Sequence, residues 1–73
     1  MSLLKRHYRV ELYGGEYTDE LLRTETFTAR TPGSAAGKAR AIFDAEPACG
    51  LAELYRVTSD GTLTYAGSFE ARR

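Results

Sequence analysis

The amino-acid sequence predicts an α+β fold of the form ββαββ, in which two antiparallel hairpins form one sheet and a single helix packs on one face of it. Three observations support this prediction. Apolar and polar residues alternate over residues 7–13, a helix start signal occupies residues 31–34, and an Asp-Gly turn precedes a second alternating segment over residues 62–70. Because 73 residues suffice for one small domain, we expect residues 1–73 to form a single domain, with residues 1–5 disordered at its end.

The first hairpin is predicted from residues 7–13 and 21–30. Alternation over residues 7–13 is typical of a half-buried strand, and the threonine-rich segment 21–30 is typical of the strand that returns beside it. Directly opposed residues share a face of the sheet, so we expect Val10 to pair with Phe27. This register leaves residues 17–20 in the loop.

The helix is predicted over residues 35–45. Thr31 can cap the free backbone amides, and Pro32 suits the first helical position because its missing N–H costs nothing there. Pro47 and Gly50 then end the helix. One stripe of this helix should face the sheet: Ala35, Ala36, Ala39, Ile42 and Phe43.

The second hairpin has two possible registers, which depend on the length of its turn. A two-residue turn would mix large and small side chains on each face. A three-residue turn, with Gly61 in the left-handed conformation, pairs Leu63 with Val57, Tyr65 with Tyr55 and Phe69 with Leu51, and we favour it because it collects the large side chains. Leu54 and Ala66 would then lie on the far face. The predicted core is Tyr8, Val10, Leu12, Phe27, Ala39, Ile42, Phe43, Leu51, Tyr55, Val57, Leu63, Tyr65 and Phe69.

Composition and charge narrow the classes of function. Ten Lys and Arg residues balance ten Asp and Glu residues, so the chain lacks the excess positive charge typical of nucleic-acid-binding peptides. No apolar run approaches the about 18 residues that cross a bilayer, and no signal peptide precedes the first predicted strand. The single cysteine, Cys49, suits a reducing compartment. We therefore expect a cytoplasmic protein with no membrane partner.

No group of residues in the sequence predicts catalysis or a cofactor. Cys49 follows the predicted helix C-terminus, where nothing lowers the pKa of its thiol, and His7 should lie at the opposite end of the molecule. One cysteine and one histidine supply too few ligands for a structural zinc ion. Neither Gly14-Gly15 nor the segment from Gly33 to Gly37 is followed by the residues of a phosphate-binding loop or of a dinucleotide-binding motif. We expect no catalytic residue, no cofactor and no metal.

Two surfaces are candidates for binding. The first is a basic pole, where the start of the first strand, the end of the second strand and the helix N-terminus should meet and could hold an anion or a nucleic acid. Its residues are Lys5, Arg6, His7, Arg30, Gly33 and Ser34. The second is the sheet face away from the helix, expected to carry His7, Arg9, Glu11, Tyr13, Thr24, Thr26, Thr28, Arg56, Thr64 and Ser68 with apolar Leu54 and Ala66. Its candidate interface residues are Arg9, Tyr13, Leu54, Arg56 and Ala66.

Two resemblances bear on function. Residues 8–10 and 24–27, with Ala36 and Ala39 on the helix, resemble the arm-type DNA-binding domains of tyrosine integrases over about half of the chain. Those domains have three strands before the helix and a basic hairpin, whereas this chain has two predicted strands there and carries Glu11; we do not adopt the resemblance. The composition, with eight Arg against two Lys and ten Ala, resembles that of small proteins of actinobacteria and their phages.

The sequence thus predicts a non-enzymatic interaction module, of the kind that phages encode. It would present a sheet face or edge to a protein partner or to a second copy of itself, because a domain this small without disulfide or metal gains stability by association. The alternative is a nucleic-acid-binding protein that uses the basic pole.

Overall fold

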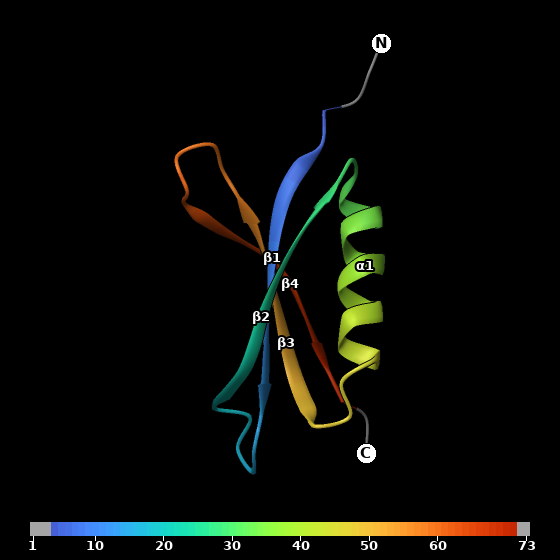
Figure 1. Cartoon of the computed structure of the whole chain (residues 1–73), viewed down its shortest axis with the longest axis vertical. Coiled ribbons are helices and arrows are strands. Elements are labelled where there is room, and N and C mark those ends of the chain that lie inside the picture. The colour runs from blue at the N-terminus through green and yellow to red at the C-terminus, as the bar shows by residue number, and fades with distance from the viewer. Residues whose placement is uncertain (1–3, 72–73) are drawn as a thin grey trace.

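The computed structural model describes residues 4–71 and confirms the ββαββ order (Figure 1). The elements are β1 (Arg6–Gly14), β2 (Glu20–Ala29), α1 (Pro32–Asp44), β3 (Cys49–Val57) and β4 (Leu63–Glu70). The strands form one antiparallel sheet in the order β2-β1-β3-β4, so each hairpin contributes one central and one edge strand. Helix α1 lies along one face of this sheet (Figure 1). The prediction that residues 1–5 are disordered falls, for residues 1–3, outside the described part.

The register of the first hairpin differs from the predicted one by two residues. Tyr8 pairs with Phe27 and Val10 pairs with Glu25, so the predicted pairing of Val10 with Phe27 was wrong. A shift of two residues keeps every side chain on its predicted face. A β-bulge at Leu22 shifts the pairing by one residue between Leu12 and Tyr13, and the Leu22 side chain packs on the core beside Gly14. A Cβ at Gly14 would come within 2.6 Å of the backbone carbonyl oxygen of Ala48, so this close approach requires glycine.

Helix α1 begins and packs as the sequence predicts. Thr31 is extended, and its Oγ1 accepts a hydrogen bond from the Ser34 backbone N–H at 3.0 Å. Pro32 occupies the first turn. Three residues of the predicted stripe, Ala35, Ala39 and Phe43, are buried, and Ala36 and Ile42 are half-buried. The small alanine side chains allow the first half of the helix to lie close to the sheet.

The second hairpin has the predicted turn, but its large side chains lie on the face of the sheet opposite to the predicted one. Leu63 pairs with Val57 and Tyr65 with Tyr55, as the three-residue turn requires. These residues face away from α1, however, because β3 also pairs with β1 in a register that sets Leu54 beside buried Val10. The prediction that they lie in the core was therefore wrong.

A β-bulge returns the end of β4 to the helix side of the sheet. Leu54 pairs with Gly67 and Tyr55 with Tyr65, so Ala66 is the extra residue. Beyond the bulge Phe69 pairs with Ala52 instead of the predicted Leu51 and stacks on Phe43, with ring centroids 6.3 Å apart. Phe69 therefore contacts the helix as predicted, whereas Tyr65 does not.

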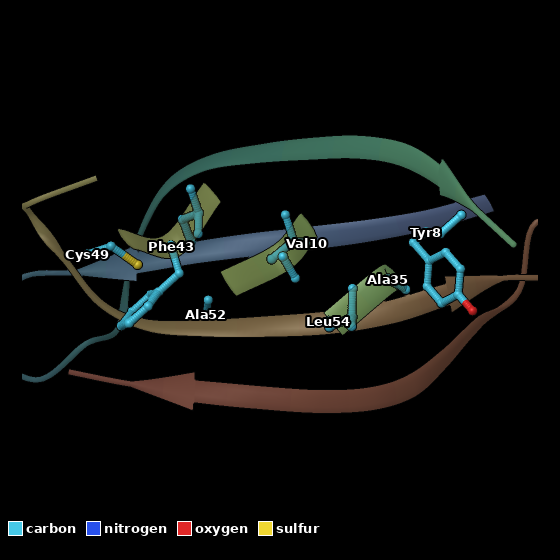
Figure 2. Packing of buried hydrophobic residues seen from close by; sticks show 10 residues of the cluster. Tyr8, Val10, Ala35, Phe43, Cys49, Ala52 and Leu54 are labelled. Carbon is cyan, nitrogen blue, oxygen red and sulfur yellow. The ribbon is translucent and has the colours of Figure 1, made fainter. Parts of the chain in front are cut away.

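The core lies between α1 and the sheet (Figure 2). Its buried residues are Tyr8, Val10, Leu12, Ala29, Ala35, Ala39, Phe43, Cys49, Ala52 and Leu54. Five predicted core residues lie instead on the opposite face: Leu51, Tyr55, Val57, Leu63 and Tyr65. Since directly opposed residues share a face, the pairing of β3 with β1 decides all five assignments.

Candidate protein-interaction surfaces

The sheet face away from α1, which we call the open face, has no covering element within residues 4–71. Strand pairing places these side chains on it: His7, Arg9, Glu11 and Tyr13 of β1, Thr24, Thr26 and Thr28 of β2, Leu51, Glu53, Tyr55 and Val57 of β3, and Leu63, Tyr65 and Ser68 of β4. The face is thus threonine-lined along β2 and aromatic and aliphatic along β3 and β4.

Two tyrosine–glutamate pairs occupy the centre of the open face. Glu11 and Glu53 are directly opposed across β1 and β3. The Tyr13 hydroxyl donates a hydrogen bond to Glu11 at 2.6 Å, and the Tyr55 hydroxyl donates one to Glu53. Both carboxylates are thereby held in place, although like charges across a strand pair repel each other.

One arginine partly neutralises this pair of carboxylates. An Arg9 terminal nitrogen lies 3.0 Å from Glu11 Oε2, whereas Glu53 forms no ion pair with a described residue. The Arg9 Nε atom is inaccessible to solvent and has no hydrogen-bond partner among the described residues. The centre of the face therefore holds one acceptor and one donor whose bonding capacity is not fully used.

The two hydrogen-bonded tyrosine side chains should lose their protons at a higher pH than an ordinary tyrosine. Donation to Glu11 and Glu53, followed by burial, raises the pKa of Tyr13 and of Tyr55 from 10.0 to about 12. A raised phenol pKa stabilises the fold below pH 10, and that contribution is lost as the pH rises through 12.

In a titration followed by phenolate absorbance, Glu53→Gln should lower the pH of the highest tyrosine midpoint, and Glu16→Gln, an exposed control, should not. An unchanged curve for Glu53→Gln would contradict the Tyr55–Glu53 hydrogen bond.

The second hairpin adds an exposed apolar surface beside this centre. The rings of Tyr55 and Tyr65 meet edge to face with centroids 6.1 Å apart. Tyr65 is 60% exposed and Leu63 is 39% exposed. Both were predicted as core, so the sequence interpretation missed this surface. A sequence signal for it exists, because Glu-Leu-Tyr occurs at residues 11–13 and again at 53–55, and the buried Leu12 of the first copy indicates a buried Leu54 in the second.

The five predicted interface residues do not lie on one surface. Arg9 and Tyr13 are on the open face, as expected. Leu54 is only 3% exposed and lies beneath α1, Arg56 is opposed to Tyr8 on the helix side, and Ala66 is the exposed bulge residue of β4. Thr64 was also predicted on the open face, but it is opposed to Arg56 and lies on the helix side. Ser68, opposed to Glu53, lies on the open face as predicted. The prediction that Leu54 and Arg56 lie on the open face was therefore wrong.

The predicted basic pole is divided between the two sides of the sheet. The start of β1, the end of β2 and the N-terminus of α1 do meet at one end of the molecule (Figure 1). Within β1, Arg6 lies on the helix side, whereas His7, opposed to Val57, lies on the open face. Arg30, Gly33, Ser34 and Lys5 are exposed at this end. The cations thus surround the pole without forming one continuous patch.

The side chains that could act as nucleophiles or metal ligands do not form a cluster within residues 4–71. Cys49 is buried, and its thiol donates to the Leu51 carbonyl oxygen at 3.1 Å. Residues 4–71 bring no three His, Cys, Asp or Glu side chains together as metal ligands. In the same residues no helix has the length and apolar character needed to span a membrane.

Fold and surface together define a small α+β domain whose sheet is covered by a helix on one face only, within residues 4–71. Comparison with protein-family models, with curated proteins and with solved structures finds no match.

Proposed function

We propose that the chain is a non-enzymatic interaction module that forms a homodimer by packing two open faces together. The observation behind this proposal is the open face itself, where Tyr65 and Leu63 expose apolar surface that no described element covers. Small domains with thin cores gain stability when such a surface is buried against a partner. A cytoplasmic, phage-related setting, inferred from composition, belongs to the same proposal.

The charges at the centre of the open face favour a second copy as the partner. In a two-fold symmetric interface, a contact from residue i to residue j is repeated from j to i. Each copy offers the Arg9 guanidinium, whose side chain is 37% exposed, and the Glu53 carboxylate, which forms no ion pair with a described residue. A two-fold axis that sets Arg9 of each copy beside Glu53 of the other would form this ion pair twice.

The size of the face limits the strength of this dimer. Nine-residue strands are about 30 Å long and four strands span about 19 Å, so the face is somewhat smaller than the about 800 Å² per partner of a standard interface. The whole face must then take part, including Tyr65. We expect a dissociation constant of about 1–100 μM, at the weak end for interfaces of this size.

The open face is less suited to nucleic acid. Three tyrosines, Tyr13, Tyr55 and Tyr65, lie on it, and exposed aromatic rings on a sheet can stack on bases. Two of the three donate to Glu11 and Glu53, whose negative charges would repel a phosphate backbone. The alternative of nucleic-acid binding therefore depends on the divided basic pole alone.

Light scattering coupled to size-exclusion chromatography tests the dimer over a range of concentrations. The wild-type chain should approach twice its 8.1 kDa mass as its concentration rises above the dissociation constant. Tyr65→Glu and Glu53→Arg should remain monomeric, because the first places an unpaired charge in the buried interface and the second sets an arginine against Arg9 of the second copy. Thr64→Glu, one residue along β4 but on the helix side, is the matched control and should still dimerise. A wild-type chain that stays at 8.1 kDa at high micromolar concentration would remove the proposal.

A further inference from the structure

A groove on the helix side of the sheet lies between the first turn of α1 and the second hairpin. The tip of the β3–β4 hairpin turns away from α1 (Figure 1), which opens a space of about 190 Å³. We call it the Tyr8 groove. Ala36 of α1 forms one wall, Tyr8 and Leu54 the floor, and Thr64 of β4 the outer wall, with Arg6 and Arg56 also lining it.

Tyr8 brings a hydroxyl group to this groove. Its side chain is 3% exposed and its ring stacks on Phe27 with centroids 5.8 Å apart. Figure 2 shows the ring extending from β1 with its hydroxyl directed to the side where β4 lies. That hydroxyl forms no hydrogen bond to another described residue. The hydroxyl is not among the solvent-inaccessible polar atoms that lack a partner, so it is free to donate to an acceptor that enters the groove.

The charges around the groove select an anion as that acceptor. Arg6 and Arg56 line it, and neither forms an ion pair with a described acidic residue. No Asp or Glu is among the described residues that line it. Pro32, in the first turn of α1, adds the partial positive charge of a helix N-terminus. A carboxylate here would accept from Tyr8 and pair with an arginine.

Volume and position indicate that the anion belongs to a polypeptide. Sites for complete small molecules usually enclose about 300–1,000 Å³, so about 190 Å³ has room for only one medium-sized apolar side chain. The outer wall is β4, an edge strand whose outer backbone groups have no neighbouring strand within residues 4–71. An extended peptide could therefore lie along this edge and insert one side chain.

We propose that the Tyr8 groove binds an acidic peptide segment of a partner protein. A leucine-sized side chain of the peptide packs on Leu54 and Ala36. A carboxylate next to it in the peptide accepts a hydrogen bond from Tyr8 and pairs with Arg6 and Arg56. Tyr65 of the open face also lines the groove, but the proposed peptide contacts are made by residues of the helix side, so this proposal does not need the open-face dimer.

Titration of the isotope-labelled full chain with capped tripeptides, followed by NMR, tests this site. The probe is acetyl-Asp-Leu-Asp-amide, and acetyl-Asn-Leu-Asn-amide and acetyl-Asp-Ala-Asp-amide are the controls for charge and for the apolar side chain. Saturable shifts should appear at Ala36, Leu54 and Thr64 with the probe. The affinity should be at least fivefold weaker with each control, because one control loses charge-assisted hydrogen bonds and the other loses apolar contact. Similar affinities for all three peptides, or shifts elsewhere, would overturn the proposal.

Three variants separate the groove from general electrostatics and from the dimer. Tyr8→Phe keeps the stacked ring and should weaken probe binding about tenfold, and Arg56→Gln should weaken it about as much. Arg23→Gln removes one positive charge far from the groove and should leave the affinity unchanged. Glu53→Arg, designed to be monomeric, should still bind the probe, so the two proposals can fail separately. Binding of free N-acetyl-leucine as tight as that of the probe would overturn the assignment to a peptide.

Discussion

Replacing Leu54 by alanine is expected to lower the free energy of unfolding by about 2–4 kcal/mol, a large part of the stability of a domain this small. The side chain is only 3% exposed and lies beside Val10 under α1, so its removal leaves a cavity in the core. Denaturant unfolding at a concentration where the chain is monomeric measures the change. If Leu54→Ala does not fold, Leu54→Val gives the same comparison at a smaller cost.

The matched control for this prediction is Leu63→Ala in the same hairpin. Leu63 is 39% exposed on the open face, so its truncation should cost less than about 1 kcal/mol in the monomer. The sequence pattern alone predicts the reverse, with Leu63 in the core and Leu54 on the surface. A larger loss for Leu63→Ala than for Leu54→Ala would therefore contradict the observed faces of the second hairpin.

The elements and their order could be predicted because their signals are local. The Thr31 cap, Pro32 and the alanine stripe define α1 within a few residues of chain. The turn at Asp60 and Gly61 sets the pairing of Val57 with Leu63 in the same way. Gly61 has a φ of 87°, the left-handed conformation that the three-residue turn requires.

The faces of β3 could not be fixed by such local signals. This strand is apolar on both sides, with Ala52 and Leu54 alternating with Leu51 and Tyr55. The pairing with β1, whose partner residues are 35 to 50 positions away, places Leu54 beside Val10. Hydrogen bonding supports the observed choice, since the Tyr55 hydroxyl finds the Glu53 carboxylate on the open face.

The candidate sites depend on the same long-range pairing. Arg6 was assigned to the basic pole and Arg56 to the sheet interface, yet both line the Tyr8 groove. The β1–β3 register brings Arg56 opposite Tyr8, and the bulge at Ala66 reorients the end of β4. The alternation of apolar and polar residues along one strand reveals neither feature, because register and bulge are both defined by how a strand pairs with its neighbour.

Replacing Phe43 by alanine should cost about 3–5 kcal/mol, the largest loss expected of any single truncation in this domain. The first half of α1 contacts the sheet through small alanines, so the C-terminal half depends on Phe43, which is 7% exposed and stacks on Phe69. The Arg40 guanidinium lies 5.8 Å from the Phe43 ring centroid and 5.9 Å from that of Phe69. It extends the same cluster across the surface and adds about 0.5–1 kcal/mol of cation–π attraction.

Ile42→Ala, at the neighbouring half-buried position, is the control for this effect and should cost less than about 2 kcal/mol. A double-mutant cycle of Phe43→Leu with Phe69→Leu, in which both variants keep apolar volume, should give a coupling of about 0.5–1.5 kcal/mol for the aromatic pair. Since Phe69 reaches the helix only because of the bulge at Ala66, this coupling also reports the bulge. Additive losses in the cycle would show that the two rings do not pack together and that β4 keeps its alternation to the end.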